Sequence, residues 1–228
     1  MTTLRMRECR AEDIDSLVDV YFAAFDGNPI QVRVFPDNSD QARLFWQGNL
    51  RDNFADPYVR IRVVEDTAVP DNSSGQNKIV AFAVWHAPRP AGAPFVPFPD
   101  NVPWPQNGNP AVADTFFRDL DRQHKRYMSD PATGQQIPHW FLELIATDPA
   151  YQGRGAAGLL LRFGEAQADA ANVPCYLDAT PAGLRVYTSA GHGFHAVETK
   201  AYFDNAYEHV FMVRDPRPAA AAAAAAET

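Results

Sequence analysis

The chain has 228 residues, of which 46% are hydrophobic and 21% charged, with 19 prolines and 13 glycines. This composition is typical of a folded globular protein and excludes a disordered tail protein, a collagen-like fibre and a coiled coil. Because 28 Asp and Glu outnumber 20 Lys and Arg, the net charge of −8 disfavours nucleic acid as a partner.

The sequence predicts neither a membrane segment nor a secretion signal. No run approaches the roughly 20 apolar residues that a membrane-spanning helix needs, and residues 1–7 lead directly into charged sequence. Two cysteines, Cys9 and Cys175, lie far apart and form no CxxC pair, which fits a reducing compartment. We therefore expect a cytoplasmic protein without a membrane partner.

The first 85 residues alternate between strand and helix patterns. Strands are indicated by apolar residues at every second position, and helices by apolar residues three or four positions apart. In chain order, these patterns predict a strand at 4–10, helices at 11–26 and 40–54, and a hairpin of strands at 58–64 and 78–85.

The C-terminal half continues the alternation after a proline-rich stretch at 88–110 and a helix at 112–128. It predicts a strand at 140–147, a helix at 155–171, a strand at 174–179, a short helix at 181–190, and strands at 194–203 and 209–213. An alanine-rich tail, 217–228, carries no chemistry. We expect residues 1–216 to form a single α/β domain, because no repeat or composition break divides them.

A glycine-rich turn separates the strand at 140–147 from the helix that follows. Small residues at a helix start let backbone N–H groups approach an anion at the positive end of the helix dipole, and Arg154 adds a charge. The expected ligand is a phosphate group. The chain has no GxxxxGK[ST] sequence, which excludes a P-loop.

The turn has two interpretations. Gly153-x-Gly155-x-x-Gly158 matches a dinucleotide-binding fingerprint, with Asp178 in the place of the ribose-binding acid. However, five residues separate Thr147 from Gly153, and the residues left after the turn are too few to complete a doubly wound sheet. We therefore favour the second interpretation and keep the first as a minor alternative.

In the second interpretation, Gln152-x-x-Gly155-x-Ala157 resembles the pyrophosphate loop of the GNAT (GCN5-related) superfamily of acyl-CoA N-acyltransferases. Residues 142–149 resemble the central strand of that superfamily, and residues 176–183 its next strand and turn. The resemblance is detailed over 140–194 and architectural over 4–85. It implies an α/β fold with a mixed, mostly antiparallel central sheet of about seven strands, splayed in the middle and flanked by helices.

The resemblance also implies catalytic residues. Glu143, on the central strand, would act as general base, and Tyr187 would protonate the leaving thiolate. Tyr187 lies where relatives often keep a tyrosine, although Gly191-His192-Gly193-Phe194 follows it where they commonly read Y-x-x-x-G-F. Glu143 could instead pair with a buried Arg or form a hydrogen bond to a neighbouring strand, and Tyr187 could be a core residue.

The same resemblance implies that acetyl-CoA is the co-substrate. Backbone groups of the central strand would pair with pantetheine, and the glycine-rich turn would hold the pyrophosphate. The cofactor-binding residues implied are Ile145, Ala146, Thr147, Gln152, Gly153, Arg154, Gly155, Ala156, Ala157 and Thr180.

The acceptor side is less defined by sequence. We expect Trp85 and His139 to contact the acceptor, and the insertion 88–139, including Trp104, to form a lid over it. The six histidines form no HExxH or similar pair, so no metal is predicted. Cys175 has no flanking His or Lys and is expected to be a buried structural thiol.

The sequence thus predicts an N-acetyltransferase that moves an acetyl group from acetyl-CoA to the amine of a small molecule. The amine would attack directly in a ternary complex, on a monomer or homodimer. Two alternatives stay open: an N-acetyltransferase that acts on a protein or peptide, and a non-catalytic acyl-CoA-binding sensor.

Overall fold

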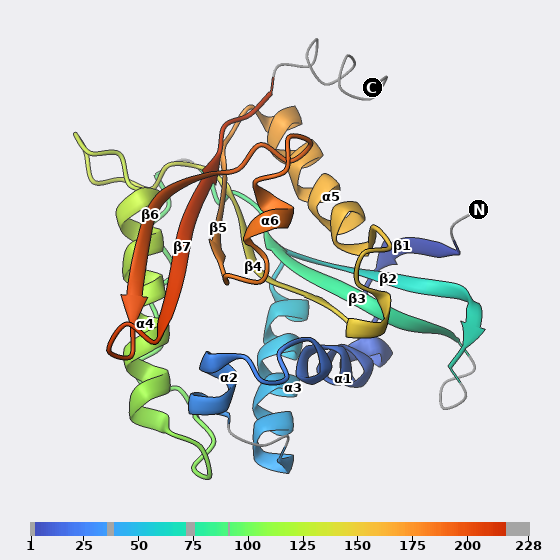
Figure 1. Cartoon of the computed structure of the whole chain (residues 1–228). Coiled ribbons are helices and arrows are strands. Elements are labelled where there is room, and N and C mark those ends of the chain that lie inside the picture. The colour runs from blue at the N-terminus through green and yellow to red at the C-terminus, as the bar shows by residue number, and fades with distance from the viewer. Residues whose placement is uncertain (1–2, 36–38, 72–75, 91, 218–228) are drawn as a thin grey trace. The chain divides into compact units, whose positions relative to one another are not determined.

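A computed structural model of the chain describes residues 3–35, 39–71, 76–90 and 92–217 (Figure 1). The predicted alanine-rich tail lies outside the described residues, apart from Arg217. The chain forms two compact units. Unit 1 consists of Met1–Val84, Phe98–Asp119 and Leu144–Leu160, and unit 2 of Trp85–Pro97, Leu120–Glu143 and Leu161–Thr228.

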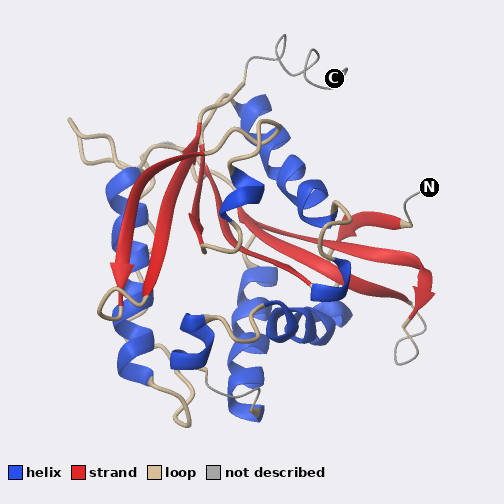
Figure 2. Ribbon diagram, viewed as in Figure 1, coloured by secondary structure: helices blue, strands red, loops and turns tan. Residues whose placement is uncertain are grey.

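Seven strands follow the order β1-β2-β3-β4-β5-β7-β6. Figure 2 draws the strands in red. They are β1 (Leu4–Glu8), β2 (Val59–Pro70), β3 (Asn77–His86), β4 (Trp140–Thr147), β5 (Cys175–Ala179), β6 (His195–Tyr202) and β7 (Tyr207–Arg214). β4 and β5 run parallel, whereas β1 with β2, β5 with β7 and β6 with β7 run antiparallel. The predicted mixed α/β sheet is confirmed, and the doubly wound parallel sheet of a dinucleotide-binding fold is excluded.

Helices accompany the strands. They are α1 (Ile14–Ala24), α2 (Pro29–Val34), α3 (Asp40–Ala55), α4 (Pro110–Tyr127), α5 (Ala156–Ala171) and α6 (Leu184–Tyr187), with 3₁₀ turns η1 (Ala11–Asp13) and η2 (Pro149–Tyr151). Within the ranges given above, none of the helices combines the length and apolar character needed to cross a bilayer.

Two helices depart from the sequence prediction. We expected no helix between the predicted helices at 11–26 and 40–54, but α2 begins at Pro29. Asn28 caps it, because its side-chain oxygen accepts from the Ile30 N–H at 2.8 Å, and proline is favoured in the first helical turn. The helix expected at 181–190 is shorter, since α6 covers only Leu184–Tyr187.

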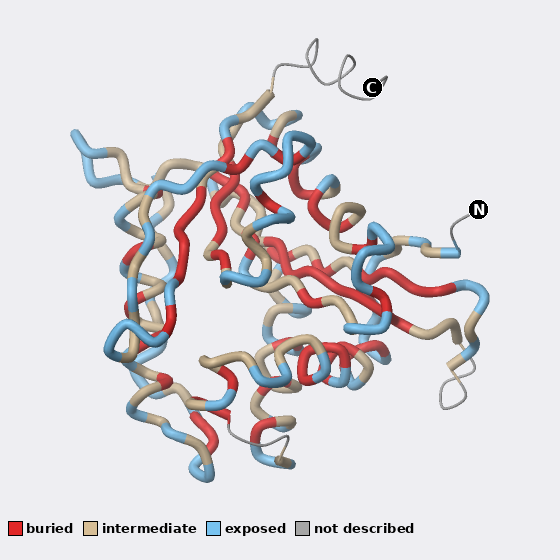
Figure 3. The backbone as a smooth tube through the Cα atoms, in the orientation of Figure 1, coloured by how far each residue is buried: buried red, intermediate tan, exposed pale blue. Residues whose placement is uncertain are grey.

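The core of unit 1 lies where α1 and α3 pack together and α3 packs on β2. Leu17 and Val18 of α1, Leu50 of α3 and Val63 of β2 have no exposed surface. Each is an apolar position on the inward stripe of its helix or strand, which is why the periodic pattern predicts these elements. Figure 3 shows that the course of β3 is mostly buried and that the course of β6 is largely exposed.

The proline-rich stretch contributes to the cores of both units. Trp104 stacks on Phe117 with ring centroids 5.3 Å apart and lies 5.1 Å from the Phe45 ring, all within unit 1. Phe95 instead packs in unit 2, against the cluster that contains Tyr176 and Phe211. The insertion is therefore anchored by its aromatic rings, and its role as a lid stays a prediction.

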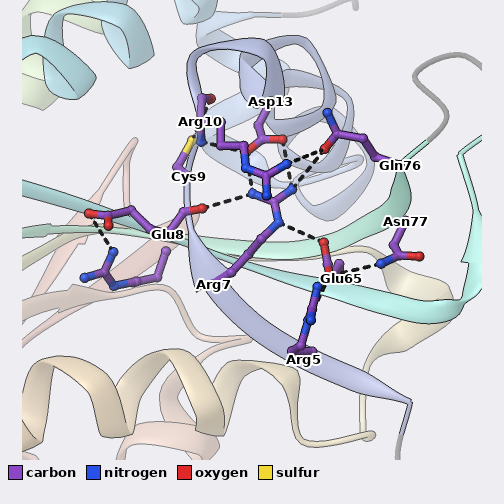
Figure 4. Close-up of polar contacts among 10 residues, drawn as sticks. Arg5, Arg7, Glu8, Cys9, Arg10, Asp13, Glu65, Gln76 and Asn77 are labelled. Atoms are coloured by element: carbon purple, nitrogen blue, oxygen red, sulfur yellow. Dashed lines mark hydrogen bonds and ion pairs between the residues drawn. The ribbon is translucent and has the colours of Figure 1, made fainter.

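A buried ion network ties β1 to β2 in unit 1 (Figure 4). Arg7 donates to Glu65 at 2.8 Å and to Asp13 at 2.6 Å. Although burial acts to raise it, hydrogen bonds from Arg7, Arg5 and Asn77 lower the pKa of Glu65 to about 2. Glu65 is therefore charged at neutral pH, and its charge is matched by its donors.

In unit 2, β4 pairs in parallel with β5 from Trp140↔Cys175 to Leu142↔Leu177. Alternate residues point to opposite faces of a strand, so Phe141 and Tyr176 share one face and Trp140 shares the other with Cys175. The Phe141 and Tyr176 rings contact His124 of α4, whereas Trp140 contacts Phe163 of α5. Glu143 and Asp178 lie one step beyond this register, on the face toward α4.

Each unit contains one cysteine. Cys9 in unit 1 and Cys175 in unit 2 are both free and buried. Burial is the main cause that raises the pKa of each thiol to about 12. Both thiols are therefore protonated at neutral pH, and the expectation of a buried structural Cys175 is confirmed.

Candidate active site

The glycine-rich turn is an open loop that leads into α5 in unit 1. Gly153 and Gly155 have φ of +73° and +88°, a conformation that favours glycine. A Cβ added at either position would meet nothing within 4 Å. The backbone conformation therefore explains the two glycines, and the loop is open on that side.

Contacts around Asp148 fix the start of this loop. Its backbone N–H donates to Val80 O at 2.9 Å, and its side chain pairs with Lys78 at 3.0 Å and caps η2 through the Ala150 N–H. Downstream, the Arg154 guanidinium lies 4.7 Å from the centre of the Tyr151 ring. A positive side chain is thus held beside an exposed turn at a helix N-terminus, an arrangement that can bind an anion.

The predicted cofactor residues divide between the units. Those from Ile145 to Ala157 lie in unit 1, where Ala146 is buried in the core and Ile145 and Thr147 are half-buried. Thr180 lies in unit 2 and accepts from the Gly183 N–H at 3.3 Å, which helps to form the turn before α6. Their contacts with acetyl-CoA stay predictions.

Glu143 pairs with a histidine that the sequence analysis did not connect to it. His86 Nε2 and Glu143 Oε2 lie 2.6 Å apart, and the two side chains are 29% and 30% exposed. Both residues belong to unit 2. The two side chains can therefore be reached from solvent while they hold each other.

Two other histidines, His124 and His139, form a pair close to His86 and Glu143. His139 Nδ1 donates to Ile137 O at 2.6 Å, so its Nε2 is left as the acceptor when the ring is neutral. His124 Nε2 lies 2.6 Å from that atom and must therefore donate to it. Burial lowers the pKa of His139 to about 4 and that of His124 well below its usual value, so both rings are neutral at pH 7.

Aromatic rings hold His124 in place. Its ring stacks on Tyr176 with centroids 4.7 Å apart and lies 4.2 Å from the Phe141 ring. The same Phe141 ring is 5.4 Å from the His86 ring. Phe141 thus joins the His86–Glu143 pair and the His124–His139 pair into one cluster on the α4 face of β4 and β5.

A carboxyl and two phenols form another polar group of unit 2. Tyr176 donates to Asp178 at 2.6 Å. Burial raises the pKa of Asp178 to about 7, although that hydrogen bond acts to lower it. Burial, and next the charge of Asp178, raise the pKa of Tyr187 well above its usual value.

The turn after Tyr187 accommodates the departure from the family pattern. Gly193, and not Gly191, has a positive φ, at +75°, so Gly193 with Phe194 makes the turn. The additional His192 is buried, and its Nδ1 lies 2.7 Å from Glu165 Oε1. The extra residues are therefore anchored to α5.

Two predicted acceptor contacts are buried. Trp85 has no exposed surface, and a Cβ at Gly164 would lie 2.3 Å from its ring, so α5 and the indole pack closely. Trp104 is 9% exposed in the core of unit 1. Their roles and that of the buried His139 stay predictions. In the part of the chain that the structure describes, no group of three or more His, Cys, Asp and Glu could hold a metal ion.

Comparison with known proteins agrees with this geometry. The model of the acetyltransferase (GNAT) family matches residues 120–194, a segment that includes Glu143, the glycine-rich turn and Tyr187. No curated protein matches the chain.

Several solved structures share the fold. A Corynebacterium glutamicum protein, described as histone acetyltransferase HPA2 and related acetyltransferase, is 21% identical with a TM-score of 0.60, over 95% of this chain and 98% of that one. An N-acetyltransferase from Staphylococcus aureus is 16% identical with a TM-score of 0.51, over 94% and 99%. Chaetomium thermophilum Naa20 is 14% identical with a TM-score of 0.53, over 93% and 86%. Residues 120–194 thus match the GNAT acetyltransferase family, and the chain shares the fold of these solved acetyltransferases.

Proposed function

We propose that the protein transfers an acetyl group from acetyl-CoA to the amine of a small molecule, by direct attack in a ternary complex. The observation that carries this proposal is the exposed turn at the N-terminus of α5, with its two positive-φ glycines and Arg154, inside the segment that matches the family. Backbone N–H groups there would bind the pyrophosphate of acetyl-CoA.

The thioester would be held by the end of β4. Ile145 and Thr147 are half-buried, and their strand backbone is the segment proposed to pair with pantetheine. Ala146 is buried in the core of unit 1, which fixes the strand that carries them. This half of the function belongs to unit 1.

The chemistry requires two proton transfers. The amine nitrogen attacks the carbonyl carbon and loses a proton as the new bond forms, and the thiolate gains a proton as the carbon–sulfur bond breaks. We assign the first transfer to Glu143 with its partner His86, and the second to Tyr187. All three side chains belong to unit 2.

The surroundings of Tyr187 support its role as a proton donor. Burial and the charge of Asp178 raise its pKa, so the phenol carries its proton at neutral pH. A Cβ at Gly183 would lie 2.9 Å from the Tyr187 ring, so this glycine leaves space for the ring. The phenol is thus held by packing.

The proposal of a small acceptor is supported by the anchored insertion. Trp104 and Phe117 are stacked in unit 1, and Phe95 packs in unit 2, so these rings are fixed by their neighbours. Rings fixed in this way favour a small acceptor over an extended peptide to which the chain would have to adapt.

The test is an acetyl-transfer assay with a panel of acceptors. The purified chain would be incubated with acetyl-CoA and spermidine, tyramine, lysine or a lysine-containing peptide, and the products followed by thiol release and mass spectrometry. We expect acetylation of a small amine. Acetylation of the peptide alone would support the protein acceptor, and acetyl-CoA binding without any product would support a sensor.

A further inference from the structure

The contact between His86 and Glu143 decides which atom is free to take a proton. His86 Nε2 lies 2.6 Å from Glu143 Oε2, a distance at which the ring N–H donates to the carboxylate. A neutral imidazole that donates through Nε2 has its lone pair on Nδ1. The carboxylate is thus occupied as an acceptor, while the histidine keeps one nitrogen free to act as a base.

The pair can be reached by a substrate. The side chains of His86 and Glu143 are 29% and 30% exposed, whereas His139 is only 3% exposed. The Phe141 ring lies 5.4 Å from His86 and forms an apolar wall beside it. An amine could therefore approach His86 with its alkyl or aryl part against Phe141.

The titratable groups around His86 differ in charge. The titratable side chains that the contacts and electrostatic interactions place near it are Glu143 on β4, His124 on α4 and His139 before β4. Burial keeps His124 and His139 neutral at pH 7. Glu143 is therefore the acidic group in contact with His86, and the His124–His139 pair adds no positive charge beside it.

We infer that His86 is the group that takes the proton from the acceptor amine, and that Glu143 is a positioning residue that orients the ring. This inference rests on the proposed function. The amine lone pair forms the bond to the carbonyl carbon, and its N–H proton moves to His86 Nδ1. The carbon–sulfur bond breaks, its electron pair stays on sulfur, and the thiolate takes the Tyr187 proton. Solvent then removes the proton from His86 and returns one to Tyr187.

Substitutions separate the two members of the pair. His86→Gln removes the base, and we expect kcat for the best amine of the panel to fall about 10²-fold or more, with the KM for acetyl-CoA unchanged. Glu143→Gln keeps an oxygen that can accept from Nε2–H, so it should reduce kcat less than His86→Gln does. Glu143→Ala removes that acceptor and should reduce kcat more than Glu143→Gln. The matched control is His195→Gln, an exposed histidine on β6 of the same unit, which should behave as wild type.

Two further measurements distinguish a base from a merely structural histidine. Added imidazole should restore part of the activity of His86→Gly, because it can occupy the vacated space and take the proton. Nitrogen NMR of neutral His86 should show the proton on Nε2 in the wild type and a mixture of tautomers in Glu143→Ala. The NMR measurement tests the pair without any turnover.

The outcomes are distinct. If the wild type acetylates no amine in the panel, the proposed function fails and the inference fails with it. If the wild type is active but His86→Gln keeps its kcat while Glu143→Gln loses it, the carboxylate itself is the base and only the inference is overturned. Absence of imidazole rescue combined with an unchanged tautomer in Glu143→Ala would also overturn it.

Discussion

One polar cluster of unit 1 and one of unit 2 differ in how their charges are matched. In unit 1, Glu65 accepts from three donors and its pKa falls to about 2, so it stays charged. In unit 2, burial raises the pKa of Asp178 to about 7 and lowers that of His139 to about 4. A charged group that is matched by its partners stays charged and holds strands together. A group such as Asp178, whose pKa lies near neutral pH, can gain or lose a proton at small cost.

This difference corresponds to the proposed division of labour. Unit 1 would bind the pyrophosphate through a loop that needs only fixed backbone dipoles and Arg154. Unit 2 would move protons and therefore contains the histidine pairs, Asp178 and Tyr187. Four substitutions test this comparison, two in each unit.

The largest effect is expected in the loop of unit 1. Gly155→Glu should abolish measurable CoA binding by calorimetry, because a negative side chain would project where backbone N–H groups meet the pyrophosphate. Gly134→Glu is a matched control, since Gly134 also has a positive φ, at +69°, and open space around it. Equal loss of affinity in both variants would mean that backbone strain, and not the anion site, causes the effect.

The ion network of unit 1 should be essential for stability. Arg7→Leu leaves Glu65 and Asp13 as buried charges without this partner, and we expect a loss of about 3–5 kcal/mol in the free energy of unfolding. Urea denaturation at neutral pH measures it. The exposed Arg51 of α3 provides the control, and Arg51→Leu should change stability by less than about 0.5 kcal/mol. A small effect of Arg7→Leu would show that water replaces the lost donor.

Tyr187→Phe should separate catalysis from binding in unit 2. Without the phenol proton, kcat should fall about 10²-fold, while the KM for acetyl-CoA stays near its wild-type value. Tyr207→Phe removes another buried hydroxyl of the same unit, one that lies 3.0 Å from His209 Nδ1, and should leave kcat unchanged. Equal kcat values for Tyr187→Phe and wild type would assign the phenol to the core.

Asp178 should make stability depend on pH. Its pKa is about 7 in the folded protein and 3.8 by reference, so the folded state binds this proton more tightly. The stabilisation is complete below 3.8 and is lost as the pH rises through about 7. The shift bounds the effect at about 4 kcal/mol, and we expect about half of that because Asp178 is only half-buried.

Asp178→Asn keeps an oxygen for Tyr176 but cannot ionise, so the variant should be about 2 kcal/mol more stable than wild type at high pH and similar at low pH. His139 acts with the opposite sign, since its lowered pKa makes stability rise with pH between about 4 and 6.5. The variant must therefore be compared with wild type at each pH. A constant difference across the range would exclude Asp178 as the titrating group.

The sequence predicted those features that depend on neighbouring residues in the chain. Apolar periodicity indicated all seven strands. The small residues from Gly153 to Ala157 indicated the turn that precedes α5 and suggested that it binds an anion. The start of α2 was missed, although Asn28-Pro29 is a favoured helix N-terminus.

Pairings across the fold could not be predicted in the same way. His86 and Glu143 are 57 positions apart, and the ring of His124 meets His139 only because α4 covers that face of β4 and β5. Such contacts depend on strand register and helix placement, which periodicity does not specify. For the same reason periodicity did not predict that Trp85 packs against Gly164.

Because each unit contains one buried cysteine, the reactivity of that thiol can measure the opening of that unit. Both thiols have pKa values near 12 and should not react with thiol reagents while they are covered, so released CoA would be the thiol detected in an assay of the native protein. Partial denaturation would expose Cys9 when unit 1 opens and Cys175 when unit 2 opens. Pulsed alkylation followed by peptide mapping would then yield two separate opening free energies. Equal values would mean that the chain unfolds as one cooperative body, and unequal values would rank the two units by their local stability.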